Sequence, residues 1–257
     1  MKTPLMLLLS LIPWHVWADD QTIEAIFKKY QATGTIVIQS YKDGTTYVWN
    51  TERSEKRFAS ASTFKIFNTL IAIDEGVFDP ESTQFIWDGT MHEFPDWNRN
   101  MSLAMAYKAS CVWCYQTLAE QIGAAKYLHH IRRAQYGEIA IPFQGTTFWL
   151  DGSFKVSAVE QIRFLRKLYQ RDLPYSESSY DALESIMQAN SPPAYRFYAK
   201  TGWARRVNPE IGWYVGYVVT SSDVWFFAMN TNIQTPLNLP LRQKITLEAL
   251  QVKGIIP

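Results

Sequence analysis

Ser62 and Lys65 are the residues whose types and spacing most directly suggest chemistry. They stand three positions apart in the run FASASTFK, which begins at Phe58 and opens an apolar helical pattern. Residues three apart share one face of a helix, so Lys65 would lie beneath the Ser62 hydroxyl. A lysine kept neutral by apolar neighbours, here Phe58, Phe64 and Phe67, can take the proton of a serine nucleophile. The pair predicts a serine acyl-transfer site; the alternative is an N-cap serine followed by a surface lysine.

Three further segments could complete such a site. Ser110 stands where one helical pattern ends and another begins, so its hydroxyl could project into a cleft. Lys200, Thr201 and Gly202 end an aromatic strand pattern, and Arg242 opens the last helical pattern. A Lys-Thr-Gly tripeptide is expected by chance far less than once in a chain of this length. Its occurrence after a Ser-x-x-Lys strongly indicates that the segments belong together.

Strand patterns at both chain ends and helical patterns between them must position these residues. Strands are expected at residues 35–38, 46–49, 196–201, 213–220 and 224–230. Helices are expected at about 22–31, 179–189 and 240–252, and one should follow Ser62. Helical patterns also cover 103–134, with breaks near Ser110 and Gly123, and another helix should begin at a capping box at 157–160. Residues 77–100 and 148–152 read as aromatic loops. The predicted fold is α+β: a central antiparallel sheet from both chain ends, flanked by helices, with a mostly helical lobe inserted at roughly 77–190. The cleft between sheet and lobe would hold the site.

The N-terminal 18 residues predict a secretory signal peptide, in preference to a buried N-terminal element. Lys2 is a short positive region, residues 5–12 are apolar, and residues 16–18 form a small-x-small cleavage pattern. Residues 19–257 are then expected to form a single domain. We expect it to be exported across the inner membrane to the periplasm, with no membrane attachment after cleavage.

Composition argues against a nucleic-acid partner. Removing Lys2 leaves 24 basic residues (25 less one) beside 24 acidic ones, with no basic stripe. The histidines of the mature chain are His92, His129 and His130. Their spacing is not that of zinc ligands, so no metal is expected, and their predicted location is a helix surface. They also suggest no Ser-His-Asp triad.

Cys111 and Cys114 are the only cysteines. An oxidising compartment would permit a disulfide, and C-x-x-C is also a redox pattern. No thioredoxin-like pattern surrounds the pair, which favours two buried, structurally passive cysteines. The sequence does not decide whether they are bonded to each other.

Together these segments resemble the penicillin-recognising serine enzymes, and most closely the class D, oxacillinase-type β-lactamases, from about Thr22 to the C-terminus. The run at 58–65 looks like the nucleophile segment, Ser110-x-Val112 like the second motif, and residues 200–202 like the Lys-Thr-Gly motif. FWLDG at 148–152, followed by residues 155–161, is similar to the tryptophan loop, and LPLR at 239–242 to the segment of the substrate-carboxylate arginine. No Glu-x-x-Leu-Asn occurs, so the class A water-activating glutamate is missing. Glu138 replaces the Asn of the family's usual Tyr-Gly-Asn, which leaves its role and the substrate range open.

The resemblance implies hydrolysis of β-lactam antibiotics by two-step acyl transfer. Ser62 would be the nucleophile, and Lys65, carboxylated by CO2 or bicarbonate, would be the general base. Ser110 and Lys200 would relay a proton to the leaving nitrogen. Backbone N–H groups of Ser62 and Trp203 would bind the oxyanion. The expected substrate-binding residues are Val112, Trp149, Leu150, Thr201, Gly202 and Arg242, with Trp149 also shielding the carbamate.

Two other interpretations share these motifs. One is a β-lactam sensor or penicillin-binding domain that acylates without efficient turnover, and the other is a transpeptidase. Sustained hydrolysis of a chromogenic cephalosporin would distinguish a β-lactamase from both. The sequence does not decide the preferred β-lactam, activity on carbapenems, or whether the protein is a monomer or a homodimer.

Overall fold

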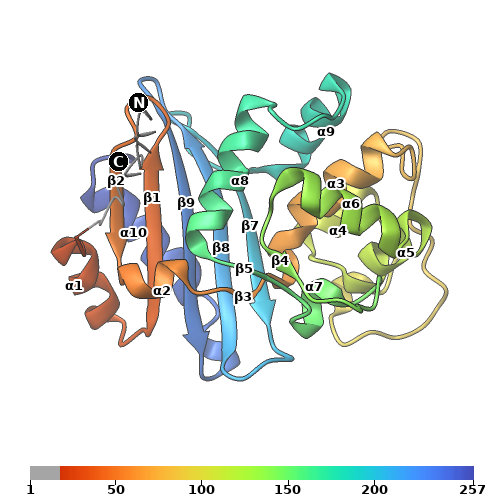
Figure 1. The fold of residues 1–257 in the computed structure, drawn as a ribbon, viewed down its shortest axis with the longest axis horizontal. Helices are drawn as coiled ribbons and strands as arrows, with labels where there is room; N and C mark the ends of the chain where they lie inside the picture. Colours follow the sequence, from red (N-terminus) through yellow and green to blue (C-terminus); the bar gives the residue numbers. More distant parts are fainter. Residues whose placement is uncertain (1–17) are drawn as a thin grey trace, which may run out of the picture.

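The fold is built on a six-stranded antiparallel sheet whose strands come from both ends of the chain (Figure 1). The computed structural model describes residues 18–257, so residues 1–17 of the predicted signal peptide lie outside the described part. The strand order is β2-β1-β9-β8-β7-β6. In that order the strands span Thr46–Trp49, Gly34–Ser40, Val224–Ile233, Glu210–Val219, Arg196–Ala204 and Gln188–Ala189. The predicted α+β fold is confirmed.

The pairing of β1 with β9 joins the two ends of the chain. Ile36 lies opposite Met229 and Ile38 opposite Phe227. These four side chains pack in one buried cluster, whereas Val37, between the two isoleucines, packs in the other cluster. Successive side chains of a strand point to opposite faces of a sheet, so β1 contributes to the core on both sides.

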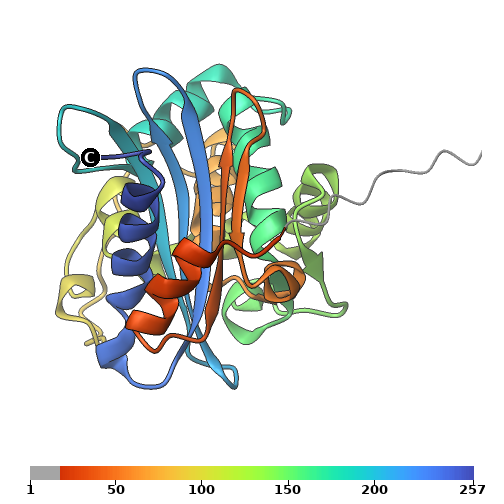
Figure 2. The same ribbon diagram turned by 90° about the vertical axis from the view of Figure 1, so that its left-hand side faces the viewer.

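Helices α1 (Gln21–Lys29) and α10 (Leu241–Val252) cover one face of the sheet (Figure 2). Helix α1 buries Ile23, Ile26 and Phe27, the i, i+3, i+4 spacing of an amphipathic helix. Helix α8 (Ala158–Gln170) contacts β9 and β1 and begins with the predicted capping box of Ser157 and Glu160. The sheet is thus the middle layer between the terminal helices and α8.

The helical lobe lies beside the sheet, beyond α8 (Figure 1). Its helices are α3 (Lys65–Asp74), α4 (Leu103–Lys108), α5 (Val112–Ile122), α6 (Ala124–Ala134) and α9 (Glu177–Met187). The predicted helix breaks near Ser110 and Gly123 are confirmed. The segment between α3 and α4 is a loop, as predicted, and contains the short 3-10 helix η2 (Pro95–Trp97).

Several short elements differ from the sequence-based expectation. The aromatic segment expected as a loop contains the one-turn helix α7 (Phe148–Asp151). Helix α9 ends at Met187, because the next two residues form β6, and β7 continues past Gly202 to Ala204. Unpredicted elements are α2 (Thr51–Glu55), η3 (Pro236–Asn238) and a small sheet of β3 (Phe58–Ala59), β5 (Phe154–Val156) and β4 (Glu138–Ile139).

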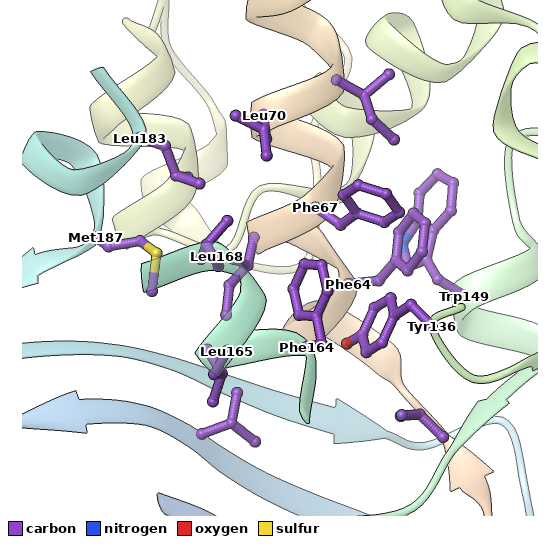
Figure 3. Packing of buried hydrophobic residues seen from close by; sticks show 14 of the residues in the cluster. Phe64, Phe67, Leu70, Tyr136, Trp149, Phe164, Leu165, Leu168, Leu183 and Met187 are labelled. Atoms are coloured by element: carbon purple, nitrogen blue, oxygen red, sulfur yellow. The ribbon is translucent and has the colours of Figure 1, made fainter. Parts of the chain in front are cut away.

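Aromatic side chains fill the core around the start of α3 (Figure 3). The ring of Phe64 stacks on those of Tyr136 and Trp149, each with an interplanar angle of 10°. Phe67 packs edge-on against Phe164 with the ring centroids 5.1 Å apart. This rigid packing fixes the turn from which α3 begins, where the Ser-x-x-Lys segment lies.

Candidate active site

The Ser62 turn is the 3-10 helix η1 (Ala61–Phe64), which leads directly into α3. The Lys65 Nζ donates a hydrogen bond to Ser62 Oγ across 3.1 Å. Lys65 is fully buried, whereas Ser62 is partly exposed. Ala61, just before the serine, has φ of +47°, a left-handed conformation that is costly for a residue with a Cβ. The predicted stacking of Lys65 beneath the Ser62 hydroxyl is present.

A chain of buried hydrogen bonds holds this turn in place. Tyr136 donates its hydroxyl proton to Gln161, and the Gln161 amide donates to Thr63 Oγ1. Thr63 in turn donates to the carbonyl of Ser60, across 2.7 Å. The indole of Trp213 donates to the carbonyl of Ala59. The strained backbone before Ser62 is therefore fixed from α8 and from the sheet.

Lys200 and Ser110 form a second lysine–serine pair. The Lys200 Nζ lies 2.7 Å from Ser110 Oγ and 3.2 Å from the carbonyl of Thr201. Ser110 also has a left-handed backbone, with φ of +55°, in the turn between α4 and α5. That turn directs the Ser110 hydroxyl from the helical lobe toward β7, the strand that carries Lys200.

The edge of β7 faces the cleft. Strand β6 pairs only with Phe197 and Tyr198, so within residues 18–257 no strand pairs with β7 on that side beyond Tyr198. Gly202 lies at this open edge, where an added Cβ would stand 3.1 Å from the carbonyl oxygen of Ser60. The glycine therefore allows the nucleophile turn to pack closely against β7.

Arg242, at the start of α10, reaches the same edge. Its Nη1 donates to the carbonyl of Gly202 across 2.6 Å and its Nε to the carbonyl of Leu239. Within the described residues its Nη2 has no hydrogen-bond partner, which leaves one donor of the fork for an anion.

Burial dominates the electrostatics of the site. It lowers the pKa of Lys65 from 10.5 to about 7, and it lowers that of Arg242 to about 10. Burial, and then the charges of Lys65 and Arg242, hold the pKa of Lys200 well below 10.5. In residues 18–257 no carboxylate is bonded to any of these three side chains. Lys65 can therefore be neutral near neutral pH, and burial favours the neutral amine at Lys200 as well.

Trp149 is fully buried on α7 and stacks on Phe64, the residue before Lys65. Its indole Nε1 has no hydrogen-bond partner in the described part of the chain. A buried donor without an acceptor is costly, so an acceptor is expected there in the working protein.

The cleft between the sheet and the helical lobe has a volume of about 290 Å³. Eight of the predicted site residues line it: Ser62, Ser110, Val112, Leu150, Thr201, Gly202, Trp203 and Arg242. Lys65, Trp149 and Lys200 are buried and do not line it. The sequence analysis missed seven lining residues: Glu93, Phe94, Trp97, Ala109, Arg205, Arg206 and Leu239. Of these seven, Glu93, Phe94 and Trp97 lie in the aromatic loop expected at 77–100, and Leu239 lies in the LPLR segment.

The surroundings of Lys65 differ from the expectation at two positions. Phe58 lies under the guanidinium of Arg53, 4.6 Å from it, and is only partly buried. The ring that faces the Lys65 amine is that of Tyr115, with its centroid 4.9 Å from Nζ. Tyr115 is on α5, so it reaches Lys65 through tertiary packing that sequence spacing does not reveal.

Glu138, which stands where the class D β-lactamases that the sequence resembles usually have asparagine, points away from the cleft. It is on β4, its side chain is 67% exposed, and it forms an ion pair with Arg57. Cys111 and Cys114 form a buried disulfide beside Ser110.

The prediction of surface histidines is wrong for His130, which is buried and bonded to Glu75 and Tyr175. His92 lies in the loop before α4, and not on a helix. Among residues 18–257, no cluster of three or more acidic, cysteine or histidine side chains is placed to bind a metal ion. No helix in the same range is long and apolar enough to cross a membrane.

An α+β fold with paired serines and lysines in one cleft defines a penicillin-binding type of serine enzyme. Residues 28–251 match the family described as "Penicillin binding protein transpeptidase domain". The chain is 40% identical over 241 residues to Beta-lactamase OXA-48 of Klebsiella pneumoniae, covering 94% of this chain and 91% of that protein. The class D β-lactamase YbXI from Nostoc superposes with a TM-score of 0.88 at 35% identity, covering 90% of this chain and 98% of that one. This chain belongs to the class D β-lactamases.

A relative with a different role also matches. The chain is 30% identical over 243 residues to Regulatory protein BlaR1 of Bacillus licheniformis, covering 93% of this chain and 40% of that protein. The shared domain therefore occurs in a regulatory protein as well as in β-lactamases.

Proposed function

We propose that the protein hydrolyses β-lactam antibiotics through an acyl-enzyme on Ser62. The observation that carries this proposal is the 3.1 Å contact between Ser62 Oγ and the amine of Lys65, whose pKa burial lowers to about 7. An amine that is partly neutral at working pH can accept a proton from a serine, which an ordinary lysine cannot. The membership of the chain in the class D β-lactamases supplies the substrate class.

In the first step Ser62 Oγ forms a bond to the lactam carbonyl carbon and gives its proton to the base at Lys65. The backbone N–H groups of Ser62 and Trp203 would hold the oxyanion, since Trp203 lies on the open edge of β7. The carbon–nitrogen bond then breaks, and the Lys200–Ser110 pair delivers a proton to the leaving nitrogen.

In the second step a water molecule attacks the ester carbonyl of the acyl-enzyme. The bond to Ser62 Oγ breaks, and the serine regains its proton. Arg242 and Thr201 would hold the substrate carboxylate throughout, Arg242 through its free Nη2. Val112 and Leu150, which line the cleft, would contact the body of the substrate.

The residues around Lys65 fit a carbamate on its amine. The amine is neutral enough to add CO2, no carboxylate in the described residues competes for it, and the buried Trp149 Nε1 lacks an acceptor. When present, the carbamate supplies the general base for both steps. Trp149 would donate its indole proton to the new carboxylate and exclude water, and Tyr115 would close the opposite side.

We also propose that the first 18 residues are a signal peptide and that the mature protein is periplasmic. The motivation is the positive, apolar and small-residue pattern of that segment. N-terminal sequencing of protein from a periplasmic extract should begin at about Asp19. A mature chain that still begins at Met1 would refute the assignment.

Turnover of a chromogenic cephalosporin tests the function against the sensor alternative. A β-lactamase gives sustained hydrolysis, whereas a sensor or transpeptidase gives one stoichiometric burst. Intact-mass measurement with excess penicillin should show one acyl adduct, and Ser62→Ala should show none. Ser60→Ala is the matched control, since within residues 18–257 the buried Ser60 Oγ has no hydrogen-bond partner. An adduct that persists on Ser62→Ala would refute the assignment of the nucleophile.

A further inference from the structure

An ion pair lies across the outer part of the cleft. Two guanidinium nitrogens of Arg205 donate to the two carboxylate oxygens of Glu93, across 2.8 and 2.5 Å. Both side chains line the same cleft as Ser62. Glu93 belongs to the loop between α3 and α4, and Arg205 to the turn between β7 and β8, 112 positions away. The pair therefore connects the helical side of the cleft to the sheet side.

Each partner is anchored to the wall from which it comes. The Arg205 guanidinium lies 5.4 Å from the centroid of the Trp203 ring, and the Trp203 indole donates to Glu210 across 2.7 Å. On the other side, Phe94 next to Glu93 packs against Trp97, 4.7 Å between centroids.

The Trp97 indole then donates to the carbonyl of Ala109, the residue before Ser110. The ion pair thus joins two wall segments that are themselves fixed to the catalytic residues. A change at the pair alters the opening between those walls without removing a catalytic side chain.

The order of residues along β7 mirrors the order of groups in a β-lactam. The carboxylate, the ring nitrogen, the lactam carbonyl and the carbon bearing the acylamino group follow one another in the substrate. Along the strand, Thr201 would bind the carboxylate and the Trp203 N–H the carbonyl oxygen, and Arg205 comes two residues later. In the binding mode of the proposed function, on which this inference rests, the acyl side chain would leave the cleft at the Glu93–Arg205 pair.

We propose that the Glu93–Arg205 ion pair is a specificity-determining strap that limits the bulk of the acyl side chain the enzyme accepts. With the pair closed the cleft has a volume of about 290 Å³, which bounds the acyl side chain that it holds. A larger side chain requires the pair to open. The side chains are 58% and 43% exposed, so the pair is weak and salt-screened, and it opens at a modest cost.

The test compares kcat/KM for penicillins that share one ring nucleus and differ only in the acyl side chain. The reference is 6-aminopenicillanic acid, which has no acyl group, and the probes are benzylpenicillin and piperacillin. Glu93→Gln and Arg205→Gln should each raise the ratio of piperacillin to reference kcat/KM by up to roughly fivefold, the scale of an exposed ion pair. High salt should raise the same ratio in the native enzyme and leave it unchanged in Arg205→Gln.

Charge reversal separates the pair from its individual side chains. The double variant with Glu93→Arg and Arg205→Glu should restore the native ratio. Glu177→Gln, which removes the ion pair between Glu177 at the start of α9 and Arg171 at the end of α8, is the matched control and should not change the ratio. An unchanged ratio in both single variants overturns the proposal. So does a ratio that rises in only one of them, or that charge reversal leaves high, because the effect would then belong to one side chain.

Discussion

Lys65 and Lys200 approach one cleft from opposite walls, and burial, followed by the charge of Lys65, lowers the pKa of Lys200. Each amine contacts a serine hydroxyl, Lys65 that of Ser62 and Lys200 that of Ser110. Each also lies over a tyrosine ring, of Tyr115 and Tyr107 respectively. Burial and the mutual repulsion of two ammonium groups favour the neutral amine at both lysines. The site thus holds a proton acceptor beside the nucleophile and a proton carrier opposite it.

The stability of the protein should depend on pH through Lys65. Its folded pKa of about 7 is below the unfolded value of 10.5, so between these values the unfolded chain binds more protons. In CO2-free buffer the free energy of unfolding should therefore rise with pH from about 7 to 10.5, by at most about 1.4 kcal/mol per pH unit for this proton. Lys65→Met should reduce the slope. Equal slopes from denaturant titrations of both proteins would contradict the lowered pKa.

Arg242 should contribute to binding the substrate carboxylate. Its Nη2 is free in the described residues while Nη1 and Nε are bonded to the carbonyls of Gly202 and Leu239. Arg242→Ala should lower kcat/KM. The corresponding loss of transition-state stabilisation should be roughly 1.5–3 kcal/mol, the range for a hydrogen bond to a charged group. Steady-state kinetics on a penicillin and on its carboxylate ester separate the two roles. For the ester, kcat/KM should change little between the native enzyme and Arg242→Ala. Equal losses of kcat/KM for the acid and the ester would mean that Arg242 only supports β7.

The large elements and the main site residues could be predicted because their signals are local. The three long strands of the C-terminal half carry aromatic and β-branched runs, and Ser157 with Glu160 marks the start of α8. Motif spacing alone placed Ser62 over Lys65. The small sheet of β3, β5 and β4 escaped prediction because strands of two or three residues show no periodicity.

Contacts between distant segments escaped prediction for a different reason. The ring of Tyr115 beneath Lys65 and the Glu93–Arg205 pair depend on how α5 and two loops pack, which no spacing in the chain encodes. Phe58 was misassigned because proximity in sequence to Lys65 does not fix the side on which a strand residue points.

The Cys111–Cys114 disulfide should stabilise the turn that presents Ser110. It closes a very short loop at the start of α5, for which loop-closure entropy predicts about 2 kcal/mol. The variant with both cysteines changed to alanine should lower Tm by roughly 4–8 °C, as expected for a domain of this size. It should also lower kcat, because Ser110 would hold the Lys200 proton relay less firmly.

The Ser110→Ala background distinguishes positioning from general stability. If the disulfide acts through Ser110, replacing both cysteines in the Ser110→Ala variant should lower Tm as before but cause no further loss of kcat. A further loss of kcat in that background, at a temperature where both proteins are folded, would show that the disulfide does not act through Ser110.

The carbamate on Lys65 makes the sharpest prediction. It forms only from the neutral amine, and the pKa of about 7 places a substantial neutral fraction at physiological pH. Mild acid protonates the carbamate, which releases CO2 and leaves an ammonium that cannot act as a base. Enzyme degassed at mildly acidic pH should therefore be slow, and bicarbonate should restore its turnover over time. A chloride salt of matched ionic strength is the control.

Trp149 tests the same prediction through the hydrogen bond that it would donate to the carbamate. Because its buried Nε1 lacks an acceptor within residues 18–257, the carbamate should gain a hydrogen bond from it. Trp149→Phe keeps the stacking on Phe64 but removes this donor, so half-maximal activity should require more bicarbonate. Carbon-13 NMR with labelled bicarbonate should show a carbamate resonance in the native enzyme, a weaker one in Trp149→Phe and none in Lys65→Met. If turnover is independent of bicarbonate and no such resonance appears in the native enzyme, Lys65 acts as a plain amine.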